Sequence, residues 1–176
     1  MRRFLIAVLT LSAFTQVVWA APASAETRFL AYNASDRVTQ ALTRGITLEA
    51  ERGLFGAISV RRIISTSNRG QADIRRGGPD EARRALPAGS KETAVYSIAP
   101  EGNGRALGRA LCPGSDEAWL VLGRVRLARP LIVHAVGRWS DGTYRHCVQL
   151  SYDWRGEWAF PPSSAVGDDS SAPVAR

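Results

Sequence analysis

Apolar and polar residues alternate in several short stretches of this chain, which is the pattern of half-buried β-strands. In residues 46–51, for example, isoleucine, leucine and alanine alternate with threonine and two glutamates. Similar or continuously apolar stretches predict strands over 28–32, 46–51, 57–66, 92–99, 118–127, 131–139 and 143–154. We therefore expect a mainly β fold with a minor α+β character: a single compact antiparallel β-rich domain with one or two short helices.

Helix signals are weaker and local. Ser35 or Asp36 can cap a helix that ends near Thr43, and residues 79–86 begin with a proline followed by two acids, which suits a helix N-terminus. Residues 105–111 predict at most a helical turn before Cys112-Pro113. Residues 68–78 are polar and contain glycines, so we expect a loop there.

The N-terminus has the pattern of an export signal. Arg2 and Arg3 precede an apolar run over 4–14, and Ala23 and Ala25 fit the small-x-small cleavage pattern. We expect a signal peptide over 1–25, one β-rich domain over 26–160 and a disordered tail over 161–176, which is rich in Pro, Ser, Ala and Asp. The alternative is a retained membrane anchor, which would reach the required length of about 20 apolar residues only if Gln16 were tolerated inside it. No later segment is long and apolar enough to span a bilayer. The expected location is periplasmic or extracellular.

The chain has two cysteines, Cys112 and Cys147. An even count in an exported chain predicts one disulfide. Closing a loop of about 35 residues would contribute about 3–4 kcal/mol in the chain-entropy model. Two thiols without CxxC spacing make a poor metal site, and we expect neither a metal nor a cofactor.

An Asp141-Gly142 pair between two alternating runs predicts a β-hairpin with a two-residue type I′ turn. That register pairs Leu131 with Tyr152, Val133 with Leu150, Ala135 with Val148, Gly137 with His146 and Trp139 with Tyr144 on one mostly apolar face. The other face then pairs Val136 with Cys147 and Arg138 with Arg145. The loop around Cys112 would fold over this more polar face.

The formal net charge is +7, and about +5 once the two signal arginines are removed. If the 118–127 strand joins the hairpin, its polar face would carry Arg124, Arg126, Arg138, Arg145 and His134. This face is a candidate anion-binding surface, and the alternative is a solvated sheet face. An anionic envelope component or a glycan would be the partner. We expect no specific nucleic-acid binding, because acids are interleaved with the arginines.

A cluster of aromatic residues suggests that the partner could be a glycan. Trp139, Tyr144, Tyr152, Trp154 and Trp158 could form a sugar-stacking platform, although aromatics at strand spacing more often belong to a core. Trp154 and Trp158 lie near the end of the ordered chain and are therefore the ones expected to be exposed.

Catalytic motifs are missing. A hydrolase base could only be His134 or His146, since the chain has two histidines and no nucleophile-elbow or phosphate-loop pattern. We therefore expect a non-catalytic envelope or secreted binding module. The alternative is a small exported hydrolase that uses His134 with an acidic partner that the sequence does not identify. This alternative would require His134 to line a cleft.

Overall fold

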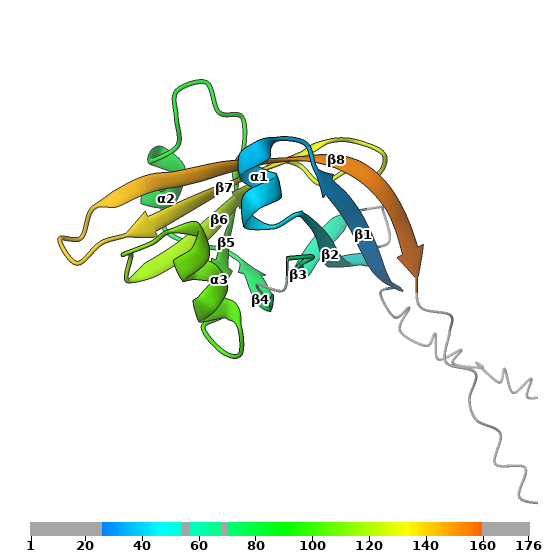
Figure 1. Cartoon of the computed structure of the whole chain (residues 1–176), viewed down its shortest axis with the longest axis horizontal. Helices are drawn as coiled ribbons and strands as arrows, with labels where there is room; N and C mark the ends of the chain where they lie inside the picture. The colour runs from blue at the N-terminus through cyan, green and yellow to red at the C-terminus, as the bar shows by residue number, and fades with distance from the viewer. Residues whose placement is uncertain (1–25, 54–56, 68–69, 160–176) are drawn as a thin grey trace, which may run out of the picture.

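Eight strands form a closed barrel in which each strand pairs antiparallel with the next and β8 returns to β1 (Figure 1). The computed structural model describes residues 26–53, 57–67 and 70–159. The expected signal peptide and C-terminal tail lie outside the described residues. The strands are β1 (Glu26–Ala34), β2 (Gly45–Arg52), β3 (Ile58–Ser65), β4 (Gln71–Arg76), β5 (Ala94–Ile98), β6 (Glu117–Leu122), β7 (Leu131–Arg138) and β8 (Tyr144–Ala159).

The expected fold class is confirmed, and barrel closure goes beyond it. Three short helices complete the described part of the chain: α1 (Arg37–Leu42), α2 (Asp80–Arg84) and α3 (Gly104–Leu111). None of the helices in these ranges has the length and hydropathy needed to cross a membrane.

The barrel interior is the main hydrophobic core. In β2, Ile46, Leu48 and Ala50 are each at most 1% exposed, as the alternation predicts. An eight-stranded barrel is just wide enough for side chains to fill it. The strand residues that fill it are Leu30, Tyr32, Ile46, Leu48, Ala50, Val60, Ile63, Ala72, Ile74, Tyr96, Leu120, Leu122, Leu131, Val133, Ala135, Leu150 and Tyr152.

One strand was missing from the sequence prediction. Residues 71–76 form β4 rather than part of a loop, and β4 joins β3 to β5. Only Ala72 and Ile74 are apolar in this strand, and both are buried. Two inward apolar residues are enough here because neighbouring strands on both sides satisfy the backbone of β4. Without β4 the sheet could not close.

The predicted register of the last hairpin is correct over most of its length. Leu131 lies opposite Tyr152, Val133 opposite Leu150, and Ala135 opposite Val148. The register then shifts between Ala135 and Val136, so that Val136 lies opposite His146. Cys147 is therefore the extra residue of a β-bulge.

The predicted type I′ turn is wrong. The Gly142 N–H donates to the Trp139 carbonyl at 2.8 Å, and the Trp139 N–H donates to the Thr143 carbonyl at 3.0 Å. These bonds define a three-residue loop in which Gly142 has φ of 78°. The longer loop offsets the strands by one residue and the bulge restores the register, so the apolar pairing farther from the turn is preserved.

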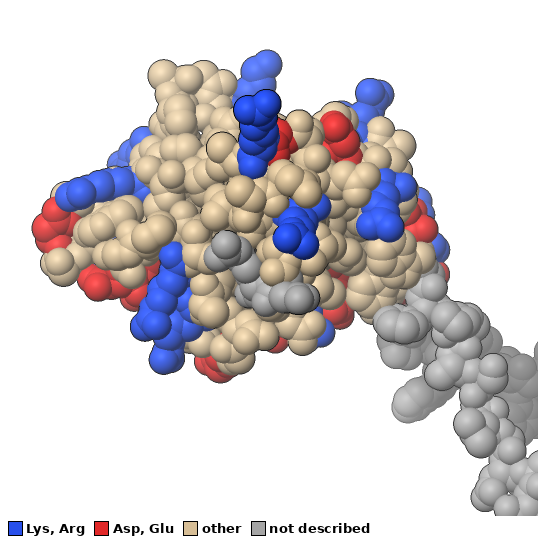
Figure 2. Space-filling view, in the orientation of Figure 1, with Lys and Arg blue, Asp and Glu red and all other residues tan. Residues whose placement is uncertain are grey.

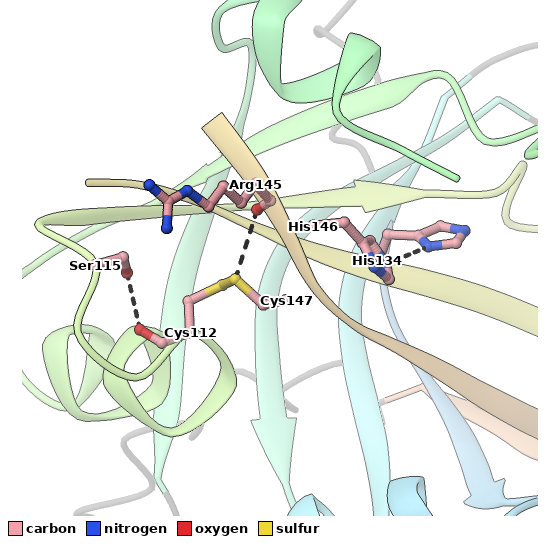
Figure 3. The surroundings of a disulfide bond; sticks show 6 residues. All are labelled: Cys112, Ser115, His134, Arg145, His146 and Cys147. Atoms are coloured by element: carbon pink, nitrogen blue, oxygen red, sulfur yellow. Dashed lines mark hydrogen bonds between the residues drawn. A yellow bond between two sulfur atoms is a disulfide. The ribbon is translucent and has the colours of Figure 1, made fainter. Parts of the chain in front are cut away.

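The bulge also changes the position of the disulfide. The predicted Cys112–Cys147 bond is present, with a Cα–Cα distance of 5.3 Å. However, Cys112 is fully buried in the barrel core and Cys147 packs against that core. The expectation that Cys147 lies on the polar face was wrong, because a bulge breaks the strict alternation of faces. Figure 3 shows the bond joining the end of α3 to β8.

One end of the barrel, which we call the closed end, is covered by α3 and α1. From α3, Leu107 and Leu111 enter the core beside Cys112. Asp36 caps the N-terminus of α1, and its carboxylate accepts a hydrogen bond from the Thr39 N–H at 2.8 Å, as predicted. Beyond α1, the Thr43 and Tyr152 hydroxyls lie 3.1 Å apart. α2 instead packs on the outer wall, where Ala82 contacts a small cluster containing Trp119, Val121 and Val136.

Candidate functional site

The opposite end of the barrel, which we call the mouth, contains a cavity of about 510 Å³. In Figure 1 the start of β1, the end of β8 and the connection between β6 and β7 gather at this end, on the right. Its lining residues are Arg28, Leu30, Ala50, Glu51, Arg52, Ala57, Ile58, Arg76, Thr93, Ala94, Tyr96, Leu122, Gly123, Arg124, Val125, Arg126, Leu127 and Glu157.

The floor of the cavity is apolar. Leu30, Ala50 and Leu122 are each about 1% exposed, and they are the last inward residues of the packed core on their strands. Tyr96 is 4% exposed, and burial raises the pKa of its phenol while the nearby Arg76 acts in the opposite direction. The phenol therefore remains neutral at physiological pH and adds no negative charge to the floor.

Arginines follow the apolar residues along the same inward direction. Arg28, Arg52 and Arg76 each lie two residues from a buried inward residue, respectively Leu30, Ala50 and Ile74. Side chains in a strand repeat their direction every two residues, so these arginines continue the interior face out to the rim. Arg124 and Arg126 join them from the connection after β6.

The two glutamates at the mouth are already engaged. Glu51 pairs with Arg61 at 2.7 Å, and Arg61 does not line the cavity. Glu157 lies 3.7 Å from Arg28, which also pairs with Glu26 at 2.5 Å.

Four of the five arginines, by contrast, have no ion pair with any described residue: Arg52, Arg76, Arg124 and Arg126. In addition, Nε of Arg28 is buried without a hydrogen-bond partner in the described part of the chain. A buried donor left unpaired costs about 1–3 kcal/mol, so an acceptor placed beside it would be stabilising. The mouth therefore carries positive charge that is not paired with carboxylates of the described residues, and this charge lies over an apolar floor.

The structure does not bring the four predicted arginines onto one face. β6 ends at Leu122, so Arg124 and Arg126 lie beyond the strand at the mouth. Arg138 and Arg145 lie at the other end of the barrel and are not opposite each other, because Arg138 faces Tyr144. The predicted common surface was wrong because β6 is shorter than predicted and because the three-residue loop places Tyr144, rather than Arg145, opposite Arg138.

Arg138 and Arg145 each have a carboxylate of their own. Arg138 pairs with Glu117 at 3.0 Å, and Arg145 pairs with Asp141 at 2.8 Å while lying over the Trp139 ring. The face visible in Figure 2 likewise carries basic side chains spread singly, several of them beside acidic ones. The outer surface of this hairpin therefore offers no concentrated positive charge, whereas the mouth does.

His134 lies in a hydrogen-bonded chain rather than in a cleft. Its side chain is 1% exposed, with Nδ1 at 3.0 Å from Nε2 of His146 and Nε2 at 3.2 Å from a Glu92 carboxylate oxygen. Figure 3 shows the dashed line of the hydrogen bond that joins the two imidazole rings, which meet edge-on with an interplanar angle of 61°. Both ring nitrogens are engaged, so His134 presents no free base to a substrate. Burial and the neighbouring His134 hold the pKa of His146 below its usual value of 6.5.

Other site chemistries are weakly represented. Among residues 26–53, 57–67 and 70–159, no group of three His, Cys, Asp or Glu side chains is arranged to hold a metal ion. A second hollow lies beside α3, between the end of β5 and the start of β6. It is lined by both basic and acidic side chains, including Arg105, Arg109, Asp116 and Glu117. Its charges are mixed, which makes it a weaker candidate than the mouth.

Comparison with protein-family models, with curated proteins and with solved structures finds no match to this chain. Its function must therefore be inferred from its own geometry.

Sequence reasoning identified two mouth arginines, Arg124 and Arg126, but missed Arg28, Arg52 and Arg76. A signal for the missed residues does exist in the chain. Each continues an inward alternation by one further step, where an apolar residue would be expected if the strand end were covered. Which strand ends meet at one mouth, however, depends on barrel closure.

Proposed function

We propose that this protein is a non-catalytic binding module that takes a small amphiphilic anion into the mouth of its barrel. One observation carries the proposal: an apolar floor lies beneath arginines that have no ionic partner among the described residues. The apolar part of the ligand would cover Leu30, Ala50 and Leu122, and its anionic group would meet the guanidinium groups. Arginine suits carboxylate and phosphate oxygens because its donors can bind two of them at once.

The size of the cavity limits the ligand. A volume of about 510 Å³ is within the range of small-molecule sites, which is roughly 300–1,000 Å³. Below the floor, the barrel is filled by side chains such as Leu48, Leu120 and Val133, each 0% exposed. A long chain therefore has no path through the barrel. A short acyl or alkyl anion fits these limits, whereas a folded polymer does not.

The hydrolase alternative receives no support from His134. A general base must reach the proton it removes, and this ring is buried with both nitrogens occupied. We therefore retain a binding function and move the proposed anion site from the sheet face to the mouth.

Calorimetric titration tests the proposal with three probes: octanoate, octanol and inorganic phosphate. Octanoate supplies both parts of the ligand, octanol only the apolar part, and phosphate only the charge. We expect saturable binding of octanoate that weakens as salt is added, because partly exposed charges are screened. Octanol and phosphate should bind more weakly. Octanol binding as tightly as octanoate, or no binding of octanoate, would overturn the proposal.

Adjacent arginines of β4 supply a matched pair of variants. Arg76 lines the mouth, whereas Arg75 does not, and both are exposed without an ion pair to a described residue. Arg76→Gln should weaken octanoate binding roughly fivefold, corresponding to about 1 kcal/mol for one charged contact that is partly exposed to water. Arg75→Gln carries the same change in net charge and should leave the affinity within twofold of the parent. Equal losses in both variants would mean that only net charge matters.

A further inference from the structure

Exposed apolar side chains gather at the mouth. Among the described residues, the large apolar side chains that are exposed are Val38 (51%), Leu127 (36%) and Trp158 (48%). Two of these three lie at the mouth, since Leu127 lines the cavity and Trp158 directly follows the lining residue Glu157. Val38 lies on α1, at the closed end.

Trp158 occupies the rim rather than the cavity. It pairs with Phe29 across β1 and β8, and the two rings stack with their centroids 6.4 Å apart. Their strand neighbours Leu30 and Glu157 line the cavity, so the stacked rings lie on the outer wall beside it. Because Phe29 stacks against it, the Trp158 indole is held in a fixed position and presents an apolar surface on the outer wall beside the mouth.

The charge of this end is complementary to an anionic surface. The cavity lining carries five arginines and two glutamates, and both glutamates already pair with arginines. Proteins that rest on anionic membranes combine basic side chains with tryptophan and leucine at the level of the lipid headgroups. The mouth combines the same residue types around its opening.

We propose that the mouth docks on the surface of an anionic lipid bilayer, with Trp158 and Leu127 at the headgroup level and the arginines against lipid phosphates. The proposal rests on the proposed function in one respect: the docked mouth opens toward the source of its amphiphilic ligand. A bilayer suits this rim better than a protein partner does, because guanidinium groups interrupt the apolar residues instead of surrounding a continuous apolar patch.

Vesicle co-sedimentation tests the docking. The protein is purified after export, so that a cleaved signal is removed, and its mass is checked before use. It is mixed with vesicles of phosphatidylcholine alone or of phosphatidylcholine with 30% phosphatidylglycerol. We expect binding to the anionic vesicles to be at least about tenfold stronger than to the neutral ones and to be reduced by 0.5 M salt. Equal binding to both vesicle types, or no binding to either, would overturn the docking proposal.

Two exposed apolar residues make a matched pair of variants. Trp158→Ala should lower the partition onto anionic vesicles by about fivefold or more, because it removes the rim indole. Val38→Ala removes a similarly exposed side chain at the closed end and should leave partition unchanged. Equal losses from the two variants would contradict docking through the mouth. Unfolding curves of both variants establish that the barrel is intact.

Failure of docking is distinguishable from failure of the binding function. Trp158 does not line the cavity, so Trp158→Ala should retain the octanoate affinity of the parent protein. Octanoate binding without vesicle binding would remove the docking proposal and leave the proposed function standing. Vesicle binding without octanoate binding would have the opposite meaning: the rim would be a membrane contact and the cavity would not hold a ligand.

Discussion

The two ends of this barrel differ in their side chains: the closed end is apolar and crosslinked, whereas the mouth is lined by arginines. The closed end is sealed by α3, whose Leu107 and Leu111 enter the core, and is fixed by the Cys112–Cys147 bond. The mouth has no comparable cover in the described part of the chain, and its inward positions become arginines such as Arg52 and Arg76. Apolar burial and a covalent crosslink stabilise the fold at one end. Like charges brought together at the other end contribute no stability of their own.

This difference indicates how the protein divides stability and function. Burying the arginines that surround the mouth without counter-ions would be unfavourable. The mouth therefore remains open to water, where charges are screened. Positions that do not improve packing but gather one kind of charge are candidates for binding. If the division is correct, changes at the closed end should alter unfolding more than binding, and changes at the mouth should do the reverse.

The largest effect is expected from removing the disulfide. A double Cys112→Ala, Cys147→Ala variant should lose about 3–4 kcal/mol of unfolding free energy, because the bond closes a loop of 35 residues. Guanidinium denaturation followed by tryptophan fluorescence measures the loss. Octanoate affinity should change by less than twofold while the variant remains folded. A large loss of affinity in the folded variant would show that the two ends are coupled.

Acidification is expected to have a smaller effect on the free energy of unfolding. This effect comes from His146, which lies on β8 in the barrel wall between the two ends. His146 has a pKa below its usual value of 6.5, owing to burial and to the neighbouring His134. The unfolded chain therefore binds the proton at a higher pH than the folded protein does. Stability from this group is fully present above pH 6.5, falls as the pH decreases below it, and levels off below the folded-state pKa.

Denaturation at pH 7.5, 6.5 and 5.5 measures this slope. In a His146→Gln variant the amide can still contact Nδ1 of His134, but it cannot titrate, so the slope should become flatter. The carboxylates of Asp36 and Asp141 have lowered pKa values and act only below about pH 3.8, outside this window. An unchanged slope in His146→Gln would assign the pH dependence to another group.

The smallest effect is expected from the mouth itself. Arg52→Gln removes an exposed arginine that has no ion pair with the described residues, so unfolding free energy should stay within about 0.5 kcal/mol of the parent, with a slight gain from reduced repulsion. The same denaturation assay measures it. A loss above 1 kcal/mol would mean that the mouth arginines stabilise the fold, and the contrast between the two ends would fail.

Local sequence patterns predicted much of the fold. The alternation of Ile46, Leu48 and Ala50 determined the inward face of β2, and Asp36 was a correct cap for α1. The pairing of Leu131 with Tyr152 followed from matching apolar faces. In each case the signal lies within one strand, one helix end or one hairpin, where propensity and side-chain periodicity act directly. The exposure of Trp158 was also correct, although Trp154 packs against the core.

Predictions failed where the outcome depends on distant neighbours. β4 has only two inward apolar residues, so its short pattern could not be distinguished from a loop until β3 and β5 were placed beside it. The bulge at Cys147 compensates for the offset of the three-residue loop, and Cys147 also forms the disulfide. Neither the loop nor the disulfide is visible in the alternation of the strand. The extra residue of the loop separated Arg138 from Arg145, and the extra residue of the bulge brought Cys147 to the core side.

The sequence by itself determined that this protein is a β-rich chain with a Cys112–Cys147 bond, because strand alternation and cysteine count are local properties. Only the tertiary structure decided where its charge gathers. Arg28, Arg52 and Arg76 come from three different strands, β1, β2 and β4, and none of these strands alone shows that the three arginines gather at one place. Closing the sheet brings their strand ends to one mouth, where side-chain alternation turns all three inward.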